Sequence, residues 1–277
     1  MPDVGAQALA GRALPGNARA RRAAPDVRVV VQRGGRQHDL LRHARRPHRA
    51  VVGRPGTAGL PVLFKLPRTV THDRRLRDCS HEVARFVRRL EPLGERATTL
   101  SVQLPQSFGP TDLGALAAFL RHLPGSHRYA VEVRHPRFFD GSPAARALER
   151  MLHEHGAEWI SFDTTVLFSA PPRSEAERDG WAKKPRLPRR MTAIGDHPMV
   201  RYIGRDDVAS TVDGWQPWLP VIAQWLKEGR TPTVFVHTPD NSDAPLLARR
   251  LHDQVRALVP ALSPLPEPVR DEPTTLF

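Results

Sequence analysis

The side chains best suited to chemistry in this sequence are polar residues at or near the ends of short β-rich runs. These residues are Lys65, Gln103, Glu132, Arg134, Asp163, Arg201 and His237. A polar residue within a strand rich in Val, Ile and Phe is costly to bury unless it is paired, so their recurrence predicts one shared polar site. The alternative is a purely structural network of ion pairs among the same side chains.

The catalytic candidates in this set are Glu132, Asp163 and His237. Glu132 could act as a general acid or base, or it could hold Arg134 as its ion partner, since side chains two apart in a strand share a face. His237 could transfer protons or be a hydrogen-bonded structural residue. Asp163 ends its run ahead of a loop, so ligand binding and turn formation are both open.

The substrate-binding candidates are cationic and amide side chains of the same region, together with one histidine. They are Lys65, Gln103, Arg134, His135, Arg201 and Asn241. Lysine and arginine bind phosphate and carboxylate groups, which predicts an anionic ligand, although Lys65 could equally be a simple salt-bridge partner. His135 stands beside Pro136, where the capping of a turn is the alternative.

Motifs for common cofactors do not accompany these residues. The sequence has no P-loop and no G-x-G-x-x-G, and after residue 61 it has no H-x-x-x-H pair. A divalent metal would need two or three of Glu132, Asp163, His135 and His237 to converge, so no metal ligand is assigned. The basic run 183–190 could contact nucleic-acid phosphates or be a solvated loop.

The candidate residues depend on strands and helices that alternate along the chain after Pro61. The β-rich runs are 62–66, 99–104, 129–134, 159–163, 199–203 and 233–237. Helical patterns are expected at 80–90, 111–123, 142–155, 215–227 and 244–258. A stretch rich in Pro and Arg, 170–190, takes the place of one helix and is expected to be a loop.

Alternating strands and helices predict an α/β fold, and the chain length suits a (β/α)8 TIM-like barrel. Such a barrel has eight strands and carries its function at their carboxyl ends, where the polar residues above are expected to meet. Six runs are visible, so the first two βα units are expected to be missing or disordered. The predicted divisions are an anomalous segment at 1–61, the barrel domain at 62–262 and an irregular tail at 263–277.

Residues 1–61 differ in composition from the rest of the chain. They hold 12 arginines and 3 aspartates but no Lys, Glu, Phe, Trp, Tyr or Ile, and they carry most of the net charge of +13. A segment without aromatic residues buries little core, which favours a disordered basic tail. The other hypothesis is a coding region read out of frame, because VQRGGRQ at 31–37 can be encoded by codons that read FNAVEGN after a one-base shift.

Five phrases, in order along the chain, resemble the YecE-like family, known as domain of unknown function 72. They are FKLPR at 64–68, VQLPQSF at 102–108, VEVRHP at 131–136, VRYIGR at 200–205 and HTPDN at 237–241. The resemblance implies a TIM-barrel fold and a family of unassigned activity. The family's first strand, with a Gly-Thr-Ser-Gly-like turn, and its second strand, which resembles FNAVEGN, are not found in frame in this chain.

Two functions remain open from the sequence. The first is a hydrolase or lyase-type enzyme acting on a phosphorylated or anionic ligand, nucleic acid included; the second is a non-catalytic barrel that binds a small ligand or nucleic acid with the same residues. The cofactor stays unassigned, with a divalent metal as one option. Cys79 is the only cysteine and no apolar run is long enough to cross a membrane, which favours the cytoplasm.

Overall fold

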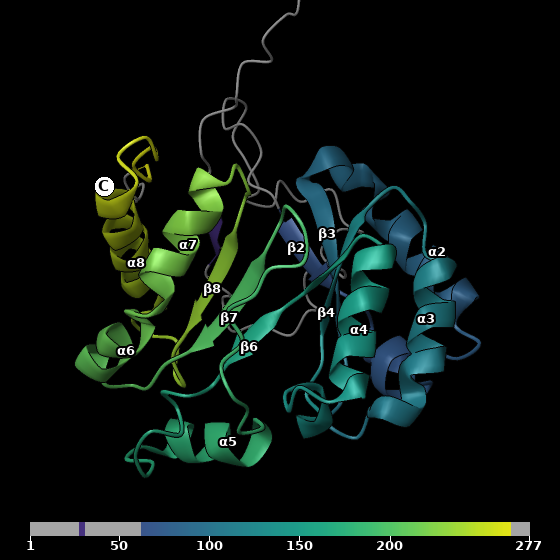
Figure 1. Cartoon of the computed structure of the whole chain (residues 1–277), viewed down its shortest axis with the longest axis horizontal. Coiled ribbons are helices and arrows are strands. Elements are labelled where there is room, and N and C mark those ends of the chain that lie inside the picture. Colours follow the sequence, from purple (N-terminus) through teal and green to yellow (C-terminus); the bar gives the residue numbers. More distant parts are fainter. Residues whose placement is uncertain (1–27, 31–61, 267–277) are drawn as a thin grey trace, which may run out of the picture.

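The computed structural model describes residues 28–30 and 62–266, which form an α/β structure with two parallel sheets between two groups of helices (Figure 1). One sheet has the strand order β2–β3–β4–β5 and the other has the order β1–β8–β7–β6. Every strand pair is parallel. The strands are β1 (Arg28–Val30), β2 (Val62–Lys65), β3 (Ala97–Gln103), β4 (Arg128–Glu132), β5 (Ala157–Trp159), β6 (Ser161–Asp163), β7 (Met199–Ile203) and β8 (Thr233–His237).

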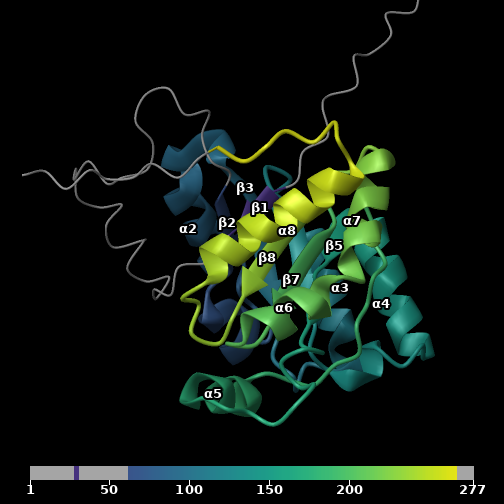
Figure 2. The same cartoon turned by 90° about the vertical axis from the view of Figure 1, so that its left-hand side faces the viewer.

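Each sheet has its own group of covering helices, and α5 stands apart from both groups (Figures 1 and 2). The first sheet is covered by α2 (Ser80–Leu90), α3 (Leu113–Arg121) and α4 (Pro143–Glu154), and the second by α6 (Val208–Trp215), α7 (Trp218–Lys227) and α8 (Ala244–Leu258). The remaining helix, α5 (Glu175–Lys183), follows β6. Apolar side chains on the helix-facing side of each sheet form two separate cores with these helices.

The opposite faces of the strands carry two tiers of side chains. The tier nearer the amino ends is apolar and consists of Ala130, Ile160, Met199 and Phe235, with Leu63 packed against them. Side chains two apart in a strand share a face, so the next tier lies directly beyond the first one. Its members are Lys65, Glu132, Phe162, Arg201 and His237. The backbone period of two thus places four of the polar candidates on one face near the carboxyl ends of the strands.

All six β-rich runs form strands, although the run 159–163 is divided into β5 and β6. The backbone N–H of Ile160 donates to the carbonyl of Val131 at 2.9 Å, so the two sheets adjoin at this residue. The α/β prediction with parallel strands is confirmed.

The loop predicted at 170–190 contains α5, so that prediction is wrong in its middle part. Ser174 accepts a hydrogen bond from the N–H of Glu177, and Glu175 adds a negative charge to the first turn, which stabilises a helix start. The helix predicted at 215–227 is also corrected. It begins at Trp218 after Pro217, and a separate helix, α6, precedes it.

The predicted barrel is not closed by the strands that the structure describes. Within residues 28–30 and 62–266, β1 pairs with β8 alone and β2 pairs with β3 alone. β1 lies in the segment expected to be missing or disordered, where two β-branched residues, Val29 and Val30, extend the edge of β8. The basic-tail and out-of-frame hypotheses otherwise concern residues outside the described part, as does the tail beyond residue 266. No helix within the described ranges is long and apolar enough to span a bilayer.

Candidate functional site

Glu132 at the end of β4 is the most deeply buried carboxylate of the polar tier, with 1% of its surface exposed. Its Oε1 accepts from Arg134 Nε at 2.8 Å, and Arg201 Nη1 lies 3.0 Å from Oε2. Burial by itself raises a carboxyl pKa, but the charges of Arg201, Arg134 and Lys65 outweigh it and hold the pKa of Glu132 at about 2. Glu132 is therefore ionised at neutral pH.

Phe162 and Gln103 complete the surroundings of the two arginines. The guanidinium of Arg134 lies 5.0 Å and that of Arg201 lies 5.1 Å from the centre of the Phe162 ring, within the range of cation–π attraction. Gln103 Oε1 accepts from Lys65 Nζ at 3.0 Å and from Arg201 Nη1 at 3.4 Å. We call Lys65, Gln103, Glu132, Arg134 and Arg201 the Glu132 cluster. The structure thus brings together five of the residues predicted from sequence.

A small cavity of about 180 Å³ opens beside the Glu132 cluster at the carboxyl ends of β7 and β8. It is lined by Lys184, Arg201, Ile203, His237, Thr238, Pro239 and Asn241. The predicted residues Arg201, His237 and Asn241 therefore meet in one pocket, in agreement with the rule that function gathers at this end of parallel strands.

His237 faces this cavity as a neutral imidazole. Burial, followed by the positive charge of Arg201, lowers its pKa to about 3. His237 Nδ1 lies 3.3 Å from Asn241 Oδ1. Because an amide oxygen only accepts, the neutral ring donates from Nδ1 and keeps a lone pair on Nε2. That Nε2 is buried and has no hydrogen-bond partner, and the Nε of Arg201 is likewise buried and unpartnered.

Lys184 is a lining residue whose place in the site the sequence did not reveal. It belongs to the basic run in which nucleic-acid contact and solvation were the open alternatives, and nothing in the sequence separates it from Lys183. Burial and the charge of Arg201 lower the pKa of Lys184. The same two causes, in the same order, lower the pKa of Lys65 to about 8, although Glu132 opposes the shift. Both lysines are therefore close to other positive charges.

Asp163 and His135 lie outside this grouping. Asp163 is fully enclosed, and its Oδ2 accepts from Arg189 Nε and from Trp218 Nε1, each at 2.7 Å. Its Oδ1 accepts from the N–H and the hydroxyl of Thr165. These bonds tie β6 to the following loop and to α7. His135 Nδ1 accepts from the N–H of Arg137 at 3.2 Å, which caps a short helical turn. Neither residue lines the small cavity.

The charges of the site favour an anion. Lys65, Arg134, Lys184 and Arg201 provide four cations against the single carboxylate of Glu132. Over the ranges that the structure describes, no group of three or more His, Cys, Asp or Glu side chains is arranged to hold a metal ion. The arrangement can therefore bind an anionic group next to a neutral histidine.

A larger cavity, of about 500 Å³, lies at the opposite, amino ends of the strands. Residues at the starts of β2, β3, β4, β5, β7 and β8 contribute to its lining. Arg128 Nη1 lies 3.3 Å from His197 Nε2, and Glu158 accepts from the backbone N–H groups of Gly195 and His197. The carboxylate in this wall is thus occupied by backbone donors. We place the candidate site at the smaller cavity because the charged residues with shifted pKa values meet there.

Residues 57–270 match the sequence model of the family described as "Protein of unknown function DUF72". The chain is also 39% identical over 203 residues to the UPF0759 protein YecE of Escherichia coli K12, and equally to the YecE protein of Escherichia coli O157:H7. Each alignment covers 73% of this chain and 74% of the YecE protein. The family resemblance predicted from the five sequence phrases is confirmed.

Two solved structures of DUF72 family proteins are similar to this one. The protein from Thermotoga maritima MSB8 aligns with a TM-score of 0.54 and 17% identity, covering 83% of this chain and 84% of that chain. The protein from Enterococcus faecalis V583 aligns with a TM-score of 0.56 and 12% identity, covering 85% of this chain and 98% of that chain. At these identities the likeness concerns the fold alone.

Glu132→Gln is expected to lower the free energy of unfolding by about 3–5 kcal/mol at pH 7, because it removes a buried counter-charge from two partly buried guanidinium groups. Chemical denaturation monitored by circular dichroism measures this difference. The pKa of Glu132 is lowered from 4.5 to about 2 in the folded chain, so its stabilising effect is present above pH 4.5 and is lost as the pH falls toward 2. The difference in the free energy of unfolding between the parent and Glu132→Gln is expected to decrease over that pH range.

Glu154→Gln, at an exposed position in α4, provides the control and should change the stability by less than about 0.5 kcal/mol. A Glu132→Gln protein as stable as this control would show that the two arginines do not depend on the carboxylate.

Proposed function

The chain belongs to the DUF72 family of proteins of unknown function, and we propose that it is an enzyme acting on a small phosphorylated or carboxylated compound held in the small cavity. The observation that carries this proposal is a pair of buried nitrogens without hydrogen-bond partners, Arg201 Nε and His237 Nε2, on two residues that line this cavity. A buried polar group without a partner costs about 1–3 kcal/mol, which a ligand that accepts from Arg201 Nε and donates a proton to a hydrogen bond with His237 Nε2 would recover.

The ligand is expected to be small. Pockets for drug-sized molecules measure roughly 300–1,000 Å³, whereas this cavity measures about 180 Å³. That volume suits a phosphate, sulfate or carboxylate group with a few further atoms. Arg201 and Lys184 would contact the anionic group directly, while Lys65 and Arg134 add positive potential through the Glu132 cluster.

His237 is the residue we propose for proton transfer. Its Nε2 keeps a lone pair without a hydrogen-bond partner while its Nδ1 proton is held by Asn241, the arrangement that a general base requires. Glu132 is proposed instead to orient Arg134 and Arg201, because a carboxylate with a pKa of about 2 keeps no proton to donate at neutral pH. A hydrolase or lyase-type reaction uses such a base beside an anion-binding group.

A non-catalytic binding protein is the second candidate, and the low pKa of His237, about 3, favours it, because a base this weak accepts a proton poorly. An anion in the cavity would raise that pKa by supplying a negative charge beside the ring. Incubation with a panel of small phosphate esters and hydroxy acids, with and without a divalent metal, distinguishes turnover from binding alone.

We further infer that the two sheets are arcs of a TIM-like barrel. The inference is supported by parallel pairing throughout, by the junction at Ile160 and by helices on the outer faces of both sheets. The apolar tier and the polar tier beyond it also resemble the layered interior of such barrels.

Lys184→Met is expected to weaken the binding of sulfate about tenfold, because it removes one cation from the cavity wall. Titration calorimetry at low ionic strength measures the dissociation constant. The neighbouring exposed residue supplies the control, and Lys183→Met should change the constant less than twofold. Equal effects of the two substitutions would mean that sulfate responds only to the overall charge of the protein.

The affinity for sulfate is expected to fall severalfold between pH 7 and pH 9.5. The pKa of Lys65 is lowered to about 8, so this lysine loses its positive charge in a range where an ordinary lysine, with a pKa of 10.5, keeps it. Sulfate keeps the same charge over this pH range, so the change in affinity must come from a titrating group of the protein. Calorimetry of Lys65→Met should give weaker binding with a flatter pH profile, and an equally steep profile in this variant would contradict the assignment.

A further inference from the structure

α5 has an unusual basis for its position. Only two of its residues, Glu177 and Gly180, are buried, and its sequence EAERDGWAK has no apolar stripe that would fix it against a core. Figures 1 and 2 show that it lies apart from the helices that cover the sheets. Its one large apolar side chain, that of Trp181, is partly buried: the ring centre lies 5.2 Å from that of Phe168, and Nε1 donates to the carbonyl of Leu167 at 2.8 Å. Polar contacts of the buried face of α5 add to this packing.

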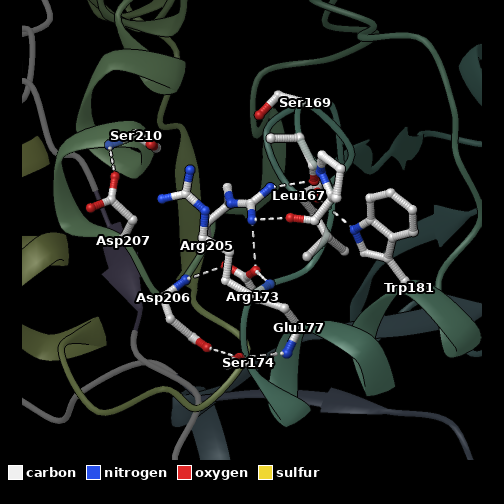
Figure 3. Close-up of polar contacts among 12 residues, drawn as sticks. Leu167, Ser169, Arg173, Ser174, Glu177, Trp181, Arg205, Asp206, Asp207 and Ser210 are labelled. Atoms are coloured by element: carbon white, nitrogen blue, oxygen red, sulfur yellow. Dashed lines mark hydrogen bonds and ion pairs between the residues drawn. The ribbon is translucent and has the colours of Figure 1, made fainter.

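A buried ion pair joins α5 to the segment that follows β7. Arg205 is 3% exposed and Glu177 is 2% exposed, and Arg205 Nη2 lies 2.7 Å from Glu177 Oε2 (Figure 3). The same guanidinium donates to the carbonyls of Ala170 and Pro171, ahead of α5. Glu177 Oε2 also accepts from the N–H of Arg173 at 2.7 Å. Both charges are thus satisfied by residues of these two segments.

Asp206 connects the same region to a third segment. Its carboxylate accepts from the hydroxyl of Ser174, the N-cap of α5 (Figure 3). It also accepts from the N–H of Asp240, after β8, at 3.3 Å. Its own N–H donates to Glu177 Oε1 at 3.2 Å. The segments after β6, β7 and β8 are therefore linked by one set of hydrogen bonds, and those after β6 and β8 contribute residues to the wall of the small cavity.

Glu177, Gly180 and Lys184 have the spacing i, i+3 and i+7, which places them along one face of a helix. The N–H of Lys184 donates to the carbonyl of Gly180 at 3.0 Å and closes the last turn. Gly180 has no side chain, and a Cβ built there would lie 3.6 Å from Lys184 Nζ. The buried residues of α5 therefore lie next to Lys184, which lines the small cavity.

We propose that the Arg205–Glu177 pair is a positioning device for the small cavity, which fixes α5 so that Lys184 reaches a bound anion. The inference rests on the proposed function, because it assigns a role to residues that control one of the cations of that site. Neither Arg205 nor Glu177 lines the cavity, and each satisfies the charge of the other, so the pair acts through Lys184 and does not touch the ligand.

The test compares Glu177→Gln with Glu175→Gln, an exposed position on the same helix. In Glu177→Gln the amides of α5 should exchange hydrogen at least tenfold faster. The dissociation constant for sulfate should rise about as much as in Lys184→Met, and adding Lys184→Met to Glu177→Gln should weaken binding less than twofold further. Glu175→Gln removes only an exposed charge of the first turn, so it should change each of the three measurements by a much smaller factor than Glu177→Gln does.

Acetylation of Lys184 Nζ, followed by mass spectrometry across a pH series, gives a readout that needs no ligand. In the parent this amine should titrate below an ordinary lysine, since its pKa is lowered, and in Glu177→Gln its midpoint should rise toward that of an ordinary lysine. An unchanged midpoint together with unchanged exchange of α5 overturns the inference. A rise in unfolding rate without these changes would likewise overturn it and leave the pair a purely structural one.

The two proposals fail in different ways. If the parent binds sulfate and Lys184→Met weakens it while Glu177→Gln does not, the positioning role is overturned and the proposed function stands. If the parent does not bind sulfate, the proposed function is overturned and the acetylation midpoint alone decides the positioning role. Should Glu177→Gln not fold, Ser174→Ala removes the cap of α5 and the bond to Asp206, and it should shift the same readouts in the same direction by a smaller factor.

Discussion

The ionised carboxylate of Glu132 is the interaction on which the rest of the site depends. A carboxylate that is 1% exposed remains charged only because two guanidinium groups and a lysine offset the cost of its burial. The same contacts fix Arg134 and Arg201 against the Phe162 ring. The carboxylate of Glu132 therefore holds the cationic side chains of the Glu132 cluster in place. These cations outnumber the carboxylate, and their excess positive charge lies beside the small cavity that His237 lines.

Much of this could be predicted from the sequence because the strand period of two is simple. Side chains two apart in a strand share a face, so each polar residue lies next to an apolar one toward the carboxyl end of its strand. The pairs are Ala130 and Glu132, Met199 and Arg201, and Phe235 and His237. The polar tier is therefore predictable from where the β-rich runs end. The parallel α/β arrangement and the family followed from the alternation of strands and helices and from short phrases. These features depend on local patterns that a sequence shows directly.

The other features depend on contacts between distant segments. Asp163 ends a strand as Glu132 does, yet its neighbours Arg189 and Trp218 come from a loop and a helix that no local pattern brings together. Lys184 enters the site because α5 turns back over the strand ends, held by Arg205. A short polar helix of this kind has no apolar periodicity, so its stretch is expected from sequence to be a loop.

Anomalous scattering from selenate, a sulfate analogue, in crystals of the full chain tests the central claim most directly. The account predicts a selenium peak in the small cavity, with oxygens within hydrogen-bond distance of the Arg201 guanidinium and Lys184 Nζ. It also predicts that the peak disappears in Glu132→Gln, where the guanidinium groups are no longer held. A peak that persists in this variant, or selenate bound only at other sites, would contradict the account.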